Sequence, residues 1–144
     1  MAYLQTPAFE NNARFAPGQN QKWLAYQSDE SGRLEIYVQS FPAKGEKLRV
    51  SSQGGSFPGW GPGGRELFYV SPDSKIMVAD VTFGPSSVSA STPRELFPLP
   101  LSNVPLTSSP FDTVDGQRFL VLSPVAPATH PLQVVDNWPA LLKH

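Results

Sequence analysis

Short runs of apolar, β-branched and aromatic residues alternate along the chain with turns rich in glycine, proline, serine and aspartate. The clearest example joins an apolar run at residues 66–70 to an alternating run at 75–81 through Ser71-Pro72-Asp73-Ser74. Two short runs of this kind on either side of a Pro/Asp turn predict an antiparallel β-hairpin. The pattern therefore favours strands over helices.

The same hairpin pattern occurs once upstream and once downstream. Its two runs lie at residues 23–27 and 34–39 in the first copy and at 118–122 and 132–136 in the last. The serine that closes the first run recurs as Ser28, Ser71 and Ser123. Intervals of about 40 to 50 residues with several strands each are typical of propeller blades. We therefore expect a repeat protein.

Further strand candidates complete the repeats. They lie at residues 13–16 and 47–51 around the first hairpin, at 56–60 and 95–98 around the second, and at 111–114 before the third. A Ser-rich loop is expected between residues 81 and 95. We predict an all-β chain of three four-stranded propeller blades at residues 8–52, 53–100 and 101–144, after a separate strand within 1–7. The third blade has no fourth strand of its own.

Three segments carry a family resemblance: RFAPG…KWLAYQSDESGRLEIYVQSFP, GWGPGGRELFYVSPDSKIMVADV and VDGQRFLVLSP. They resemble TolB-type (WD-repeat-like) propeller repeats, and the chain is similar to the C-terminal end of the propeller sensor domains of bacterial serine/threonine protein kinases. The resemblance implies a β-propeller fold and a sensor role. It leaves the compartment open, with an extracytoplasmic parent domain as one reading.

The repeats depart from the Ser-Pro-Asp-Gly turn of that family. The first two turns keep glycine without the aspartate, at Pro17-Gly18 and Pro62-Gly63-Gly64, and the third keeps Asp115-Gly116 without Ser-Pro. Glycine still permits the positive φ that such turns need, so the fold is expected to survive. The chain contains neither the Gly-rich loop nor the His-Arg-Asp segment of a kinase.

Three blades cannot form a ring, because closed propellers have about four to eight blades. We therefore expect a homodimer in which two chains form a six-bladed β-propeller, with blade 3 packed against blade 1 of the partner. The run at residues 2–6 is expected to complete the partner's third blade beside 132–136.

Composition narrows the classes of partner. Lys+Arg 11 against Asp+Glu 12 gives a net charge of -1 with no basic run, so nucleic acid is not an expected partner. Cysteine is absent, which excludes disulfides and thiolate chemistry. Neither a membrane span nor a signal peptide is apparent, so we expect a soluble chain that makes no membrane contact.

Loops on one rim of a propeller converge on its central channel, where ligands bind. The loops entering each first strand offer Glu10, Asn12 and Asp112, whose oxygens suit a divalent cation such as Ca²⁺, with Zn²⁺ as the other choice. Six-bladed propellers that hydrolyse phosphotriesters or lactones resemble this set in residue types. The alternative is a turn at Asn12, a solvated Glu10 and a strand cap at Asp112.

The hairpin loops on the same rim offer Asp29, Asp73 and His130. His130 is a candidate general base or metal ligand with Asp29 or Asp73 as its orienting partner. The alternative is an ordinary surface loop. The aromatic residues, including Phe15 and Trp60, are expected to pack in the core first and to stack on ligands second.

Two functions remain open at this point. One is a sensor-type module that binds a small molecule, peptide or protein in its channel. The other is a metal-dependent hydrolase of phosphotriesters, lactones or esters whose site forms across the dimer. The chain has no Gly-x-Ser-x-Gly elbow or other motif specific for catalysis, which favours the binding module.

Overall fold

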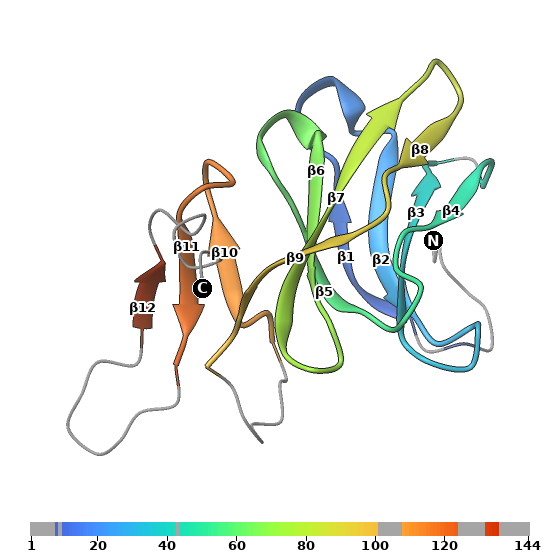
Figure 1. Ribbon diagram of the computed structural model, residues 1–144. Helices are drawn as coiled ribbons and strands as arrows, with labels where there is room; N and C mark the ends of the chain where they lie inside the picture. The colour runs from blue at the N-terminus through green and yellow to red at the C-terminus, as the bar shows by residue number, and fades with distance from the viewer. Residues whose placement is uncertain (1–7, 9, 43, 101–107, 124–131, 136–144) are drawn as a thin grey trace.

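The computed structural model describes residues 8, 10–42, 44–100, 108–123 and 132–135. Within these residues the chain consists of β-strands, two short 3-10 turns and connecting loops, with no α-helix (Figure 1). The predicted all-β class is therefore confirmed. The run at residues 2–6 lies outside the described part, so the predicted strand exchange stays a prediction.

The strands form three antiparallel sheets, and none of them closes on itself within the described residues. The first sheet contains β1 (Glu10–Phe15), β2 (Trp23–Ser28), β3 (Glu35–Ser40) and β4 (Lys47–Arg49). The second contains β5 (Ser56–Trp60), β6 (Glu66–Val70), β7 (Lys75–Phe83), β8 (Val88–Ala90) and β9 (Arg94–Pro98). The third contains β10 (Phe111–Thr113), β11 (Phe119–Leu122) and β12 (Leu132–Val135). Neighbouring strands pair in chain order except at β7, which pairs with β9 as well as β8.

Most predicted strands are present with small shifts at their ends. One expectation was wrong: the Ser-rich loop after residue 81 contains a strand. β7 continues to Phe83 and returns as β8, through a turn closed by the Gly84 N–H donating to the Ser87 carbonyl oxygen at 2.8 Å. Val88 is buried and Phe83 stacks on Trp23, so apolar contacts hold this extra hairpin.

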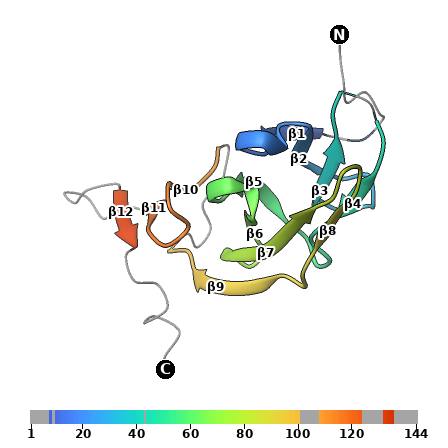
Figure 2. The same cartoon turned by 90° about the horizontal axis from the view of Figure 1, so that it is seen from above.

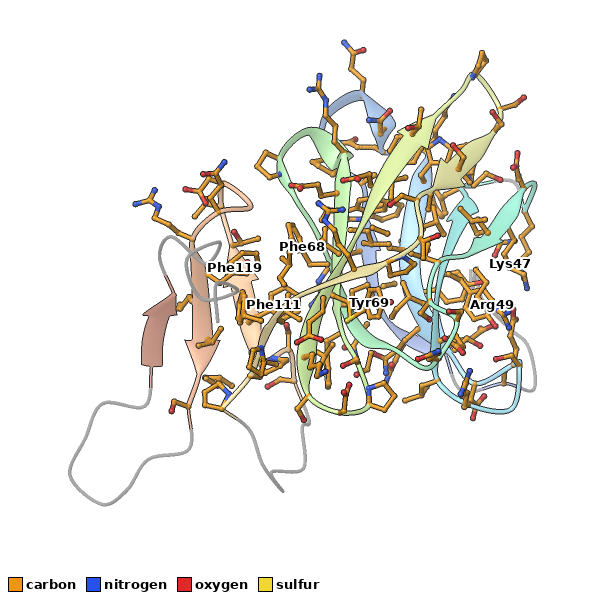
Figure 3. All side chains as sticks on the ribbon, in the orientation of Figure 1. Lys47, Arg49, Phe68, Tyr69, Phe111 and Phe119 are labelled. Carbon is orange, nitrogen blue, oxygen red and sulfur yellow. The ribbon has the colours of Figure 1, made fainter. Side chains whose placement is uncertain are left out.

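The second sheet packs between the other two, which explains the continuous apolar run of β6. Leu67 and Tyr69 belong to the core shared with the first sheet, whereas Phe68 and Val70 belong to the core shared with the third. Figure 3 shows Phe68 on the side of Phe111 and Phe119, with Tyr69 on the other side. A strand buried on both faces needs apolar residues at every position.

An aromatic cluster fixes the third sheet to the second. Phe119 is fully buried, and its ring centroid lies 5.1 Å from that of Phe68 and 5.2 Å from that of Phe97, both in edge contact. Phe111 lies 6.4 Å from it. Edge-to-face pairs add stabilisation beyond the area that they bury.

The three sheets fan out from one side of the molecule. Figure 2 shows β1, β5 and β10 along this side and β4, β8 and β9 toward the opposite periphery. β5 lies beside both β1 and β2 of the first sheet. The first strand of each sheet therefore contributes to one common surface, which we call the inner surface.

Candidate ligand-binding hollow on the inner surface

A hollow of about 630 Å³ lies on the inner surface, over the ends of β1, β5 and β10. We call it the inner hollow. Its lining includes Arg14, Phe15, Trp60, Phe111, Asp112 and Val114 together with several prolines. Its size and mixed apolar and charged lining are typical of a small-ligand site.

Matching bulges shape the two inner strands. The pairing register shifts between Asn11 and Arg14 in β1 and between Ser56 and Gly59 in β5. Each bulge contains a non-glycine residue with φ 54, Asn12 in β1 and Phe57 in β5. Such backbone is costly, above all for phenylalanine, and persists only where its surroundings hold it. Bulges bend a strand and redirect its side chains.

A buried amide holds both bulges. The Oε1 atom of Gln27 accepts a hydrogen bond from Nδ2 of Asn12 at 2.9 Å and another from the backbone N–H of Phe57 at 2.8 Å. Gln27 itself is 4% exposed. One side chain of the first sheet therefore sets the relative position of β1 and β5.

The bulge in β1 turns apolar and cationic side chains toward the inner hollow. Phe15 is 51% exposed although its ring contacts Phe41 edge-on at 5.0 Å, and Arg14 is exposed. Nε1 of Trp60 donates to the backbone oxygen of Arg14 at 3.0 Å, which ties β5 to β1. The inner hollow therefore combines aromatic surface with a guanidinium group.

The position of Phe15 in a strand predicted that it packs in the core, and this was wrong, since it is 51% exposed. The bulge at Asn12 inserts a residue into the alternation of β1, so the side chains after it change face. Trp60 is half-buried. This partial exposure fits a side chain that packs in the core and also faces the hollow. Arg14 and Gln27 were missed, because their roles depend on contacts between two sheets.

The residues predicted to hold a cation are spread over this region. Asp112 is exposed and lines the inner hollow, and its Oδ1 accepts from the Thr113 N–H at 2.8 Å. Asn12 bonds to Gln27, and Glu10 pairs with Ser28 at the start of β1; neither lines the hollow. In the described part of the chain no three His, Asp or Glu side chains gather closely enough to hold a metal ion. A cation held across a ring stays a prediction.

The residues predicted for acid–base chemistry are not brought together in the inner hollow. The strand pairing places the β2–β3 and β6–β7 loops beside the first residues of β1 and β5. This is the rim on which the order of the repeats predicts them. Asp73 instead lines a different pocket, where hydrogen bonding by Ser71, and then the bond and charge of Lys75, lower its pKa. Asp29 opens the β2–β3 loop, and its carbonyl oxygen accepts from the Gly32 N–H at 2.9 Å. His130 lies outside the described residues.

No protein-family model and no curated protein matches this chain. Among the described residues no helix is long and apolar enough to cross a membrane. The case for a function therefore depends on the geometry of the inner surface.

Proposed function

We propose that this chain is one half of a six-bladed β-propeller, and that two copies form a ring whose central channel binds a small molecule or peptide. The observation that carries the proposal is that the first strands of three antiparallel sheets lie along one side of the molecule (Figure 2) and that residues of all three line one hollow. In a propeller, the first strand of each blade lines the channel, and ligands bind there.

The outer face of the third sheet supports the need for a second copy. β11 alternates, with Phe119 and Val121 buried against the second sheet and with Leu120 43% and Leu122 37% exposed on the other face. The second sheet, by contrast, is covered on both faces. The first sheet of a partner, placed on this face, would cover Leu120 and Leu122 and continue the stacking.

The lining of the inner hollow indicates the ligand class. The exposed ring of Phe15 and the half-buried ring of Trp60 offer apolar stacking surface, and Arg14 offers a guanidinium for a carboxylate, sulfonate or phosphate group. An amphipathic anion, with an apolar body and one acidic group, uses both features. We favour binding over hydrolysis because the described residues gather no acid–base pair and no metal cluster in the hollow.

A titration with the fluorescent anion 1-anilinonaphthalene-8-sulfonate tests this proposal, because the probe joins aromatic rings to a sulfonate. We expect saturable binding to the wild type and roughly tenfold weaker binding by Arg14→Glu, from the loss of one charge-assisted contact. Arg49→Glu is the matched control, since Arg49 is exposed on β4 at the far edge of the first sheet (Figure 3). Equal affinities of the Arg14 and Arg49 variants would refute the proposed site.

A further inference from the structure

A second pocket of about 310 Å³ lies away from the inner hollow, beside the β6–β7 hairpin. Its walls come from the loop between the first two sheets, from the hairpin turn and from the start of β9. The residues that matter for its chemistry are Tyr69, Ser71, Asp73, Lys75, Thr92 and Glu95. We call it the hairpin pocket. One chain supplies all of it, so it does not depend on ring formation.

The wall formed by the connecting loop is held in place. The buried carboxylate of Glu35 accepts hydrogen bonds from the Gly54 N–H at 3.0 Å and from the Ser51 hydroxyl, and Nε of Arg33 reaches it at 2.8 Å. Gly54 has φ +94, and a Cβ there would lie 2.5 Å from Cγ of Pro72. Glycine therefore lets the connecting loop close against the hairpin turn.

An ion network lies along one side of the hairpin pocket. Nζ of Lys75 is 2.9 Å from Oε2 of Glu95 and 3.3 Å from Oδ2 of Asp73. The hydroxyl of Ser71 donates to Oδ1 of Asp73 and accepts from the Lys75 backbone N–H at 3.1 Å. Two carboxylates around one ammonium leave a net negative charge, which opposes the binding of an anion.

Tyr69 lines the hairpin pocket and is 3% exposed. Within the described residues its hydroxyl forms no hydrogen bond and its oxygen is not fully covered, since the only fully buried polar side-chain atom without a partner there is Nε1 of Trp23. Burial, and then the charge of Glu35, raise the pKa of Tyr69 to about 12, so the group stays a neutral donor and acceptor. A hydroxyl that lines a pocket and has no partner there is free to donate to and accept from a ligand.

The hydrogen-bonding groups select among ligand classes. The carboxylates of Asp73 and Glu95 only accept, Lys75 only donates, and Tyr69 does both. An ammonium ligand cannot accept from Lys75, and a carboxylate ligand is repelled by the acidic pair. Adjacent hydroxyl groups donate and accept at once, and therefore match every group. We propose that the hairpin pocket binds a neutral polyhydroxyl ligand of monosaccharide size.

The pocket volume and ligand size set the expected affinity. A ligand of about a dozen non-hydrogen atoms at roughly 0.3 kcal/mol per atom binds with a dissociation constant in the millimolar range. Amide chemical shifts in two-dimensional NMR measure such binding. The probes are the methyl glycosides of glucose, mannose and galactose, with ethanolamine and acetate as the amine and anion comparisons.

We expect at least one methyl glycoside to shift the amide resonances around residues 52–54 and 71–75, and to saturate below about 50 mM. Tyr69→Phe and Glu95→Gln should each weaken this binding by roughly fivefold or more, because the first leaves a ligand hydroxyl unpaired and the second replaces a charged acceptor by a neutral amide. Glu30→Gln is the matched control, since Glu30 forms an equivalent ion pair with Lys47 at 2.7 Å outside the pocket.

Three results would overturn the proposal: no shift with any glycoside, shifts with ethanolamine or acetate alone, or equal binding by Tyr69→Phe and the wild type. The spectra of the variants also report whether the fold is intact. Tyr69→Phe keeps the ring and its packing, so a loss of binding with an unchanged spectrum elsewhere assigns the effect to the hydroxyl.

Discussion

The side-chain oxygen of Gln27 accepts a hydrogen bond from the backbone N–H of Phe57, 2.8 Å away, and so joins the first sheet to the bulge of the second. The same oxygen accepts from Asn12 in the bulge of β1. Two strained backbone positions in different sheets, both with φ 54, therefore depend on one buried amide. This arrangement shapes the inner hollow.

We predict that Gln27→Leu lowers the free energy of unfolding by about 2 to 3 kcal/mol, because the Phe57 N–H loses its partner in a buried place. Gln39→Leu is the comparison, since Gln39 is also buried in the first sheet and, among the described residues, its side-chain oxygen accepts from the Tyr26 hydroxyl at 3.2 Å. Its cost should be about 1 kcal/mol. Urea denaturation measures both. Equal costs would show that Gln27 does not hold the two bulges.

The aromatic cluster at Phe119 provides a second prediction. Phe119→Ala should cost about 3 to 5 kcal/mol, because a fully buried ring is removed from between the second and third sheets. Phe15→Ala removes the same side chain from a site that is 51% exposed, and should cost about 1 kcal/mol or less. Denaturation of the two variants under the same conditions tests this. A small effect at Phe119 would mean that the third sheet is not packed as described.

The carboxylate of Asp115 makes the stability of the turn between β10 and β11 depend on pH. Its carboxylate accepts from the backbone N–H groups of Arg118 and Gln117 at 2.8 and 2.9 Å and from Nε of Arg118 at 2.9 Å. These bonds, the Arg118 backbone first, lower the pKa of Asp115 from 3.8 to about 2. A lowered pKa stabilises the fold above the unfolded value of 3.8, and this contribution is lost as pH falls toward about 2.

The prediction is that Asp115→Asn is less stable than the wild type at neutral pH, and that the difference shrinks between pH values of about 4 and 2. The asparagine still accepts from the backbone, so the turn is kept. Urea unfolding across this pH range measures the difference. A constant difference at all pH values would contradict the assignment of the charge effect to Asp115.

The strands were predictable where burial follows a regular pattern. The apolar run at residues 66–70 predicted a strand of a hairpin, and β6 forms it in the middle sheet, where both of its faces are covered. β8 was missed because the turn at residues 84–87 has the composition of a loop, and its strand character depends on contacts of Phe83 and Val88. The hollow was less predictable. The bulge in β1 moves the side chains of Arg14 and Phe15 to the other face of the strand, and no local sequence pattern predicts the bulge.

The hairpin pocket shows the same limit. Asp73 was a candidate from its place in a turn, but its partners Lys75 and Glu95 were not considered, because Glu95 lies in another strand. Tyr69 belongs to a run that indicates core packing, and only the tertiary structure shows that it lines a pocket. A single residue in a turn can therefore be picked out from the sequence, whereas the grouping of residues from different strands cannot.

Light scattering of the purified chain at micromolar concentration tests the central claim, that two half-rings join around the inner hollow. We predict a mass of twice the 15.7 kDa chain for the wild type. Leu120→Lys, on the exposed face of β11, should reduce it to the mass of one folded chain, since a buried lysine opposes association. A wild-type mass of 15.7 kDa would contradict the account.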